Sequence, residues 1–533
     1  MHPEASRLES RDMTRFAALA AAVAVCWLWP VGPAHAATCD SLASLRLAST
    51  TVTVAELVAP GAFTVPAPAG APAGGPPAAG LGRAFLALPA FCRLAATLTP
   101  SSDSDIKIEV WLPASGWNGK FQAVGNGGWT GSIPYAAMAE GVAAGYATAA
   151  TDTGHVGNTA SFALGHPEKV IDFGYRAVHE MTSKAKAVID AFYGAAPKLS
   201  IWNGCSQGGR QGIAEAVRYP ADFDAIVAGA PAVNYMHLHA GRMAINRAVN
   251  ATPAAVIPPA KYALLHTAVL AACDARDGVA DGVIENPGAC TFDPKALQCS
   301  GQDDSTCLTP SQVQSAATMY DGARHPTTRA HVLPGVARGS ELGWAVIGSP
   351  APISYAADAF KYIIANDAAW EASRFNSAMD LDRAQAADPD DVLGSTNPDL
   401  RPFFARGGKL LLYHGWSDPQ VTPFNTINFF QRMLAIQGGA GVGTSVQLYM
   451  VPGMNHCAGG PGTDTFGKMA AIEEWIGTGS APARIEASHQ TNGAIDRTRP
   501  LCPFGQVARW NGSGSTDTAS SFSCVAATLD APR

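Results

Sequence analysis

Charged side chains are scarce in this sequence, and basic residues form no stripe. Lysine, arginine, aspartate and glutamate make up 15% of the 533 residues, and the formal net charge is −7. The absence of a basic stripe argues against binding to nucleic acid. The sequence also lacks a CxxC pair and a zinc-like histidine cluster, so a zinc or thiol-redox centre has no support. Beyond the N-terminus, no segment is long and apolar enough to predict a membrane span.

The N-terminus has the features of a signal peptide, which we predict for residues 1–36. Arg11 and Arg15 flank Met13, an alternative start, and a short apolar run follows. Residues 34–36 (AHA) offer a cleavage site of small residues. The apolar run is too short to cross a bilayer, which disfavours the alternative of a membrane anchor. We therefore expect a secreted or periplasmic protein.

The cysteine count agrees with export. The sequence has eleven cysteines, and removal of Cys26 with the signal peptide leaves an even number. Paired cysteines suit an oxidising compartment, where disulfides form and persist. The spacing of the cysteines alone does not fix how they pair.

The most informative motif is GCSQG at residues 204–208. It fits the G-x-S-x-G nucleophile elbow, in which a tight strand-to-helix turn exposes a serine hydroxyl. Residues 198–202 predict the strand before the turn, and residues 209–219 predict the helix after it. Glycine suits so sharp a bend because a bulkier side chain would clash. The alternative is a plain surface turn, since a chain with 54 glycines produces such matches by chance.

A histidine beside a cysteine occurs late in the sequence, in the NHC motif that follows an apolar, strand-like run. If Ser206 and His456 share a hydrogen bond, Cys205 and Cys457 come close enough to form a disulfide. Such a bond would close a loop of about 250 residues and clamp the elbow against the histidine. The alternative is that each cysteine pairs elsewhere or stays buried and free.

An acidic residue is expected between the serine and the histidine, because α/β-hydrolases carry their triad in that chain order. Residues 409–416 predict a buried strand, and Asp418 follows it. A carboxylate there can orient the histidine and stabilise its imidazolium form. The alternative is an Asp-Pro turn. We interpret His414, on the same strand, as a hydrogen-bonded interior residue and not as a second base.

Together these motifs resemble the tannase and feruloyl esterase family, which includes the mono(2-hydroxyethyl) terephthalate hydrolases. The resemblance runs from about residue 105 to 460 and implies an α/β-hydrolase fold with a large inserted lid domain. It also implies Ser206 as nucleophile, His456 as base and Asp418 as orienting acid, beside a Cys205–Cys457 disulfide. The matching stretches are GNGGW at 125–129, TDTGH at 151–155, GCSQGGR at 204–210, HGWSDP at 414–419 and PGMNHC at 452–457.

Acyl transfer needs hydrogen-bond donors for the oxyanion. The residue after the nucleophile, Gln207, is expected to supply one backbone N–H, and a glycine of an early loop the other. That glycine is Gly127 or Gly128, and the resemblance favours Gly128. Proximity and the family pattern also suggest four further disulfides: Cys39–Cys92, Cys273–Cys290, Cys299–Cys307 and Cys502–Cys524.

The chain is too long for one compact core, so a main domain with an insertion is expected. We assign residues 37–231 and 403–533 to the two parts of the α/β-hydrolase core and 232–402 to the lid. The lid is predicted to be rich in helices and loops, because the alternation of strands and helices stops there. Within the core, residues 106–154 predict strands separated by glycine turns, and 173–194 predict a helix.

One loop of the lid resembles a calcium-binding loop. Asp274, Asp277 and Asp281 could supply carboxylate oxygens, and Val279 and Val283 backbone carbonyls, which together suit Ca²⁺. The spacing departs from that of an EF-hand, and the alternative is two Asp-Gly turns in a solvated loop. The resemblance implies a structural calcium ion here, and no organic cofactor is expected.

These observations predict a secreted serine esterase that cleaves esters of aromatic acids, such as ferulate, caffeate or gallate, some of them plant-derived. The first alternative is an esterase of the same family acting on terephthalate monoesters or other aromatic esters. A weaker alternative is a non-catalytic, calcium-stabilised extracellular binding protein. Trp370, Phe375, Tyr355 and Tyr362 are aromatic candidates in the lid, but each could equally belong to its core. The sequence carries no signal for the oligomeric state.

Overall fold

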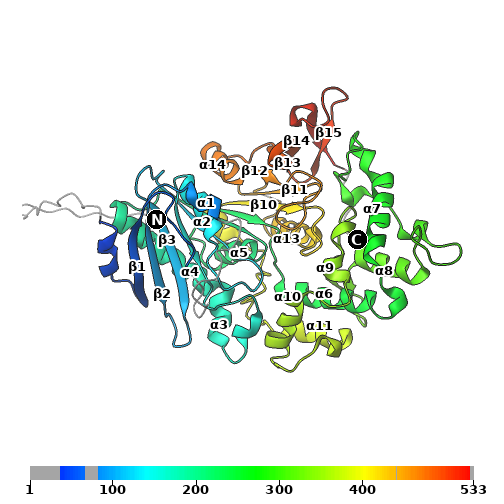
Figure 1. Ribbon diagram of the computed structural model, residues 1–533, viewed down its shortest axis with the longest axis horizontal. Helices are drawn as coiled ribbons and strands as arrows, with labels where there is room; N and C mark the ends of the chain where they lie inside the picture. The colour runs from blue at the N-terminus through cyan, green and yellow to red at the C-terminus, as the bar shows by residue number, and fades with distance from the viewer. Residues whose placement is uncertain (1–36, 67–81, 440, 528–533) are drawn as a thin grey trace, which may run out of the picture.

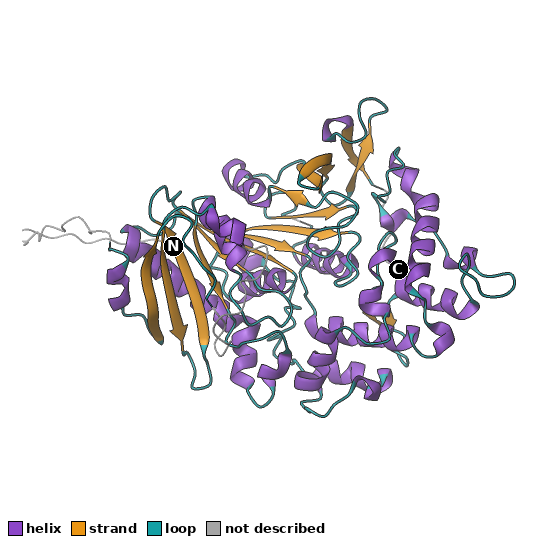
Figure 2. Ribbon diagram, viewed as in Figure 1, coloured by secondary structure: helices purple, strands orange, loops and turns teal. Residues whose placement is uncertain are grey.

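A mostly parallel β-sheet forms the centre of the protein (Figures 1 and 2). The computed structural model describes residues 37–66, 82–439 and 441–527, so the predicted signal peptide lies outside the described residues. Among these residues the sheet has nine strands in the order β1-β2-β3-β5-β4-β6-β7-β10-β11. Their bounds are β1 Thr50–Val58, β2 Phe91–Leu98, β3 Ile106–Pro113, β4 Lys120–Val124, β5 Ala147–Thr151, β6 Leu199–Cys205, β7 Ala225–Gly229, β10 Lys409–Gly415 and β11 Val446–Val451.

Strands β5, β4, β6, β7, β10 and β11 run parallel to one another, while β1, β2 and β3 form an antiparallel edge. The parallel strands are almost wholly buried, as expected for a sheet with helices on both faces. Strand β10 pairs directly with β7, so that Lys409 lies opposite Ala225. The sheet is therefore completed by strands that come after the long helical insertion.

Successive residues of the parallel strands face opposite helix layers, because side chains alternate along a strand. On one face Leu410 and Leu412 pack in the core cluster that includes α4, α5 and α13. On the other face Leu411 packs with Trp475 of α14, and α2 covers the neighbouring part. The bounds of these helices are α2 Tyr135–Ala143, α4 Ala177–Tyr193, α5 Gln207–Arg218, α13 Pro423–Ile436 and α14 Lys468–Thr478.

Residues 232–402 fold mainly as helices around a hydrophobic cluster of their own, to which Trp129 and Phe173 of the sheet domain contribute. Figure 1 shows this part, in green to yellow, beside the sheet. The domain boundaries assigned from the sequence stay a prediction. The elements here are α6 Tyr235–Val249, α7 Pro259–Cys273, α8 Pro310–Asp321, α9 Ala345–Gly348, α10 Ser354–Ala359, α11 Ser377–Ala386 and α12 Arg401–Ala405, with a short hairpin of β8 Ala323–Arg324 and β9 His331–Leu333.

One helical run of the described chain, Pro253–Asp277, is long and apolar enough to cross a membrane by length and composition alone. It includes α7, whose Tyr262, Leu265 and Val269 are buried in the cluster just described. Packing within the protein thus accounts for part of its apolar character. The sequence analysis predicted no membrane span beyond the N-terminus. Among the described residues, this helical run is the exception by length and composition.

Two regions differ from the sequence prediction in detail. Residues 106–154 contain helix α2 in addition to strands β3, β4 and β5. The predicted helix at 173–194 is present, but it begins with a π-helical turn, Asp172–Arg176, before α4. After β11 the chain adds small sheets that the core assignment did not anticipate. Their strands are β12 Thr465–Phe466, which precedes α14, and β13 Ile485–Thr491, β14 Ala494–Leu501, β15 Gln506–Trp510 and β16 Phe522–Ala526, which follow it.

Candidate active site

Ser206 occupies the tight turn between β6 and α5, as the sequence predicts. Its backbone has φ +63° and ψ −122°, a conformation that non-glycine residues adopt only under constraint. The constraint comes from close contact around the turn, since a Cβ on Gly204 would lie 2.5 Å from the backbone of Gly208. The Ser206 N–H also donates a 2.9 Å hydrogen bond to Gly229 of β7. The turn therefore presents the serine at the carboxyl end of the parallel strands.

A serine, a histidine and an aspartate from three distant segments form one chain of hydrogen bonds. Nε2 of His456 lies 2.8 Å from Oγ of Ser206, and Nδ1 of the same ring lies 2.6 Å from Oδ2 of Asp418. The carboxylate can only accept, so Nδ1 carries the hydrogen and Nε2 is free to accept from the serine. This tautomer is the one that can remove a proton from the hydroxyl.

The Asp418 carboxyl is fully buried behind the histidine. Its Oδ1 accepts hydrogen bonds from the backbone N–H groups of Gln420, at 2.7 Å, and Val421, at 3.0 Å. Burial alone would raise the pKa of Asp418, but the charge of His456 and hydrogen bonds from His414 and His456 outweigh it. The pKa of Asp418 therefore lies well below its usual range. The carboxylate is held ionised where it can stabilise an imidazolium.

A disulfide joins the two residues that flank this site, Cys205 and Cys457, whose Cα atoms are 6.0 Å apart. It links the elbow directly to the histidine loop. The other four predicted pairings are also formed: Cys39–Cys92, Cys273–Cys290, Cys299–Cys307 and Cys502–Cys524. Every cysteine of the described residues is accounted for by these bonds.

The glycine loop after β4 is anchored to the elbow. The Asn126 N–H donates to the side chain of Gln211 on α5, at 3.1 Å, and the Gly125 N–H donates to Asn203 of β6. Gly128 follows with φ +50°. Gln207 is the first residue of α5, directly after the serine. The two residues predicted to supply oxyanion donors thus lie on segments that meet at the elbow.

Among the aromatic candidates of the lid, Tyr355 is distinguished by its position. A Cβ on Gly128 would lie 2.8 Å from Cε1 of Tyr355, so this ring covers the glycine loop. Trp370 and Phe375 instead pack against Phe360 inside the lid. Of these three side chains, Tyr355 is therefore the one that lies against the proposed oxyanion loop.

Two buried arginines near the site were missed by the sequence analysis. Arg210 of α5 donates to the carbonyl of Gly174, at 2.9 Å, and to the hydroxyl of Ser395, at 3.1 Å. Arg242 of α6 donates from Nε to the carbonyl of Gln420, at 2.8 Å. Burial lowers the pKa of each guanidinium to about 10. Arg210 lies in the GCSQGGR stretch. A charged residue next to the glycines of the elbow could have indicated a buried, hydrogen-bonded arginine.

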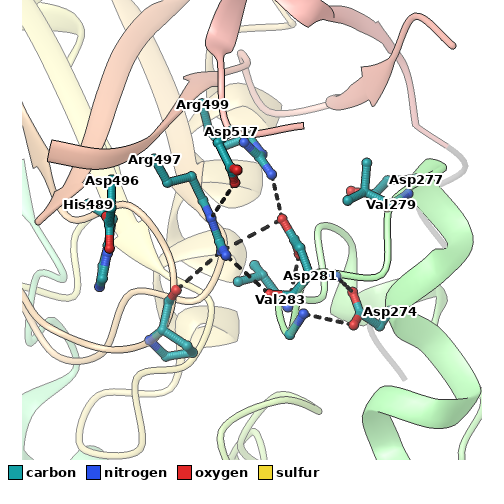
Figure 3. Close-up of polar contacts among 12 residues, drawn as sticks. Asp274, Asp277, Val279, Asp281, Val283, His489, Asp496, Arg497, Arg499 and Asp517 are labelled. Carbon is teal, nitrogen blue, oxygen red and sulfur yellow. Dashed lines mark hydrogen bonds and ion pairs between the residues drawn. The ribbon is translucent and has the colours of Figure 1, made fainter. Parts of the chain in front are cut away.

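The loop proposed to bind calcium lies beside the C-terminal hairpins (Figure 3). Asp274 accepts hydrogen bonds from the N–H groups of Asp281, at 3.2 Å, and Gly282, at 2.9 Å. The side chain of Asp281 points toward Arg499 and Arg497 of β14 and is paired with them.

The electrostatics of this loop favour a cation. Burial, together with the charges of Asp281 and Asp274, raises the pKa of Asp277 to about 6. Asp274 and Asp277 also line a cavity of about 180 Å³. The oxygen donors therefore fit Ca²⁺ in kind, although the three carboxylates do not converge within 4.8 Å of one another in the described structure.

Two other groups of described residues bring three metal-ligand atoms within 4.8 Å of one another. One consists of Cys299, Asp303 and Cys307, but both of its sulfurs are in a disulfide. In the other, His179 bonds Asp222, at 2.7 Å, beside the buried Glu215. Burial and the charge of Asp222 raise the pKa of Glu215 well above its usual range, as expected for a protonated acid beside a carboxylate.

Known proteins similar to this chain are esterases. The model of the family described as tannase and feruloyl esterase matches residues 92–525. An uncharacterised esterase from Xanthomonas campestris pv. campestris is 36% identical, with 93% of this chain and 92% of that protein covered. A mono(2-hydroxyethyl) terephthalate hydrolase from Piscinibacter sakaiensis is 32% identical, with 83% and 85% covered.

The crystal structure of feruloyl esterase B from Aspergillus oryzae superposes with a TM-score of 0.83 at 29% identity. The match covers 91% of this chain and 99% of that one. Both the sheet order and this likeness assign the α/β-hydrolase fold. The chain belongs to the tannase and feruloyl esterase family and is a carboxylic-ester hydrolase.

Proposed function

We propose that the protein hydrolyses its ester through a Ser206–His456–Asp418 triad. His456 removes the proton from Ser206, whose oxygen attacks the ester carbonyl, while Asp418 stabilises the imidazolium that results. The same histidine then protonates the departing alcohol, and water releases the acid from the acyl-enzyme. The backbone N–H groups of Gly128 and Gln207 are proposed to bind the oxyanion.

The observation that carries this proposal is the uninterrupted hydrogen-bonded chain from Ser206 Oγ to Asp418, with contacts of 2.8 and 2.6 Å. Serine hydroxyls are weak nucleophiles unless an oriented base takes their proton. A non-catalytic binding protein would not need the strained serine backbone, the buried carboxylate and the disulfide beside them.

For the substrate, we propose an ester of an aromatic acid, with feruloyl, hydroxycinnamoyl or galloyl esters first. Two observations support this choice: the chain is similar to a feruloyl esterase from Aspergillus oryzae, and the Tyr355 ring lies over the glycine loop. Terephthalate monoesters are the second candidate, because a hydrolase of such an ester is 32% identical to this chain. Both candidates place a flat ring beside the serine.

A substrate panel combined with serine labelling tests the proposal. Methyl ferulate, methyl gallate and mono(2-hydroxyethyl) terephthalate are offered to the purified enzyme, and a fluorophosphonate probe reports the reactive serine. Ser206→Ala should abolish both hydrolysis and labelling and keep the melting temperature. Ser315→Ala, at a buried lid serine bonded to Ala255, is the matched control and should keep both activities. Turnover retained by Ser206→Ala would refute the triad.

We propose that the enzyme acts outside the cytoplasm, after removal of residues 1–36. Five disulfides support this location, since such bonds are rare where thiols are kept reduced. N-terminal sequencing of protein recovered from periplasm and medium tests it. A mature protein that still begins at Met1 or Met13 would contradict it.

We also propose a structural Ca²⁺ held by Asp274, Asp277 and Asp281 with the carbonyls of Val279 and Val283. Burial and the charge of Asp281 raise the pKa of both Asp274 and Asp277, and a bound ion would offset that charge. Asp281 would then face the ion as well as Arg499. Calorimetric titration of chelator-treated protein with Ca²⁺ should give micromolar or tighter binding, and an absence of heat would end this proposal.

A further inference from the structure

Two histidines, not one, approach the same oxygen of the buried Asp418 carboxylate. Oδ2 lies 2.6 Å from Nδ1 of His456 and 3.1 Å from Nε2 of His414. Since Oδ1 is already bonded by two backbone N–H groups, the carboxylate is surrounded by four donors. Only one of the two rings reaches Ser206, so the second has another task.

The position of His414 is unusual for a polar side chain. It lies on β10, opposite Met450 of β11, and its side chain is fully buried. Leu410 and Leu412 precede it on the same face of the strand and belong to the main hydrophobic cluster. A buried imidazole is costly unless its nitrogens are bonded. The strand pattern alone would favour an aliphatic residue here.

The hydrogen-bond partners of His414 fix its tautomer. Nε2 lies 2.8 Å from the carbonyl oxygen of Val421, besides its contact with Asp418. Both partners can only accept, so Nε2 carries the hydrogen. Nδ1 lies 2.8 Å from the hydroxyl of Thr426 on α13, which can donate to it. All the polar atoms of the neutral ring are thus satisfied, and its one N–H is directed at the loop that carries the triad acid.

We propose that His414 is a positioning residue of the triad. Its N–H holds Oδ2 of Asp418 toward His456 and disperses the negative charge of that oxygen. This inference rests on the proposed function. A carboxylate bonded at one oxygen only can rotate, whereas donors at both oxygens fix its plane. A second donor on Oδ2 also weakens the attraction between that oxygen and the His456 imidazolium. His414 therefore shares the negative charge that would otherwise act on His456 alone.

The other charged group close to this arrangement is Arg242 of the lid helix α6. Its guanidinium binds the carbonyl of Gln420 and not the carboxylate. Gln420 links the two groups, because its N–H donates to Oδ1 of Asp418 at 2.7 Å. The groups that face Asp418 are thus His414, His456 and, at longer range, Arg242.

Two substitutions of the same residue separate positioning from packing. The amide nitrogen of His414→Gln can occupy the place of Nε2 and keep the bond to Asp418. The shorter side chain of His414→Asn reaches only the place of Nδ1. It keeps the hydrogen bond with Thr426 and loses the one with Asp418. His179→Ala is the matched control, because it removes a histidine–aspartate bond of 2.7 Å on α4, outside the site.

The measurement is the rate of fluorophosphonate labelling between pH 5 and 9, with near-ultraviolet circular dichroism as the test of folding. Loss of a hydrogen bond to a charged group corresponds to a rate about ten- to a hundredfold lower, so His414→Asn should be slowed by that factor. Its acid limb should also move to higher pH, because Asp418 then attracts the imidazolium more strongly. The glutamine variant and the control should follow the wild type.

Two results would overturn the inference. In the first, both His414 variants label at the wild-type rate. In the second, both slow equally and the acid limb does not move, as a packing role predicts. Failure of the proposed function looks different: wild-type protein would not be labelled at all, or Ser206→Ala would still be labelled.

Discussion

The indole N–H of Trp129 donates a 3.0 Å hydrogen bond to the carbonyl oxygen of Tyr355. This bond crosses from the loop after β4 to helix α10 of the lid. The Tyr355 ring lies against Gly128, the residue before Trp129 in the chain. Helix α10 of the lid is therefore fastened to the proposed oxyanion loop.

Truncation of this ring should change selectivity. Tyr355→Ala removes the aromatic surface over Gly128 but keeps the backbone carbonyl that Trp129 binds. An aromatic contact contributes about 0.5–1.5 kcal/mol, so kcat/KM for 4-nitrophenyl ferulate should fall about two- to tenfold relative to 4-nitrophenyl acetate. Tyr362→Ala, at a ring packed against the lid cluster, should leave the ratio unchanged. Equal losses on both esters for Tyr355→Ala would contradict the assignment.

Removal of the disulfide beside the site should lower both stability and rate. The Cys205–Cys457 bond spans 252 residues, and loop-closure entropy assigns about 5 kcal/mol to a loop of that size. The double serine variant should also lose about a hundredfold in kcat, since small misplacements of reacting groups are costly.

The control for this prediction is the double serine variant of Cys502 and Cys524, whose bond spans 22 residues in the C-terminal hairpins. It should melt at a lower temperature and keep its kcat. Thermal melting and kcat, measured on the same preparations, separate the two effects. If the two double variants have the same kcat, the disulfide next to Ser206 does not position the triad.

Removal of Ca²⁺ by a chelator should destabilise the protein and leave the geometry around Ser206 intact. A ligand at a hundred times its dissociation constant stabilises a fold by about 2.7 kcal/mol, so removal of Ca²⁺ should lower the melting temperature. Asp277→Asn should melt like the chelated wild type and gain nothing from added Ca²⁺. Asp517→Asn, at an exposed acid paired with Arg497, should respond to Ca²⁺ as the wild type does. Identical melting of the wild type with and without chelator would count against the metal.

Stability should depend on pH through Asp152, which is buried at the end of β5. Burial raises its pKa to about 7, against the opposing effect of hydrogen bonds from Gly154 and Lys107. The pKa of Asp152 in the folded protein exceeds its value in the unfolded chain. Its contribution to the free energy of unfolding is therefore fully present below about pH 4 and is lost as the pH rises through about 7.

Asp152→Asn tests this dependence, because both backbone N–H groups bond to Oδ1, which asparagine can keep. The variant should gain on the order of 2 kcal/mol relative to the wild type between pH 5 and pH 8. Denaturant unfolding at the two pH values measures the difference. A constant difference would show that Asp152 does not titrate in this range.

The sequence predicted the elbow and the strands beside it because each depends on local patterns, whereas the full set of disulfide pairs depended on the family resemblance. Ser206 lies in a five-residue motif, and Asp418 directly follows an apolar strand. The side-chain partners could not be predicted in this way. That Arg499 pairs with Asp281 depends on how the C-terminal hairpins fold onto the lid, which no local pattern encodes.

One local signal was overlooked. Asn492 and Gly493 both have positive φ and form the turn between β13 and β14. Asparagine followed by glycine is the strongest short-range indication of a β-hairpin. Helix α2 was missed for a different reason: its alanine-rich segment lies among glycine turns and short strands, and its helical period is brief.

The position of the helical insertion has a consequence for how the protein is made. Strand β7 pairs with β10, and Ser206 meets a histidine 250 residues further along the chain. At about 5–20 residues per second, the ribosome adds those residues over roughly 10 to 50 seconds. Throughout that time the nascent polypeptide exposes an unpaired edge of its growing sheet. A product of interrupted translation would carry Ser206 but lack the strands that complete the sheet and the histidine of the proposed triad.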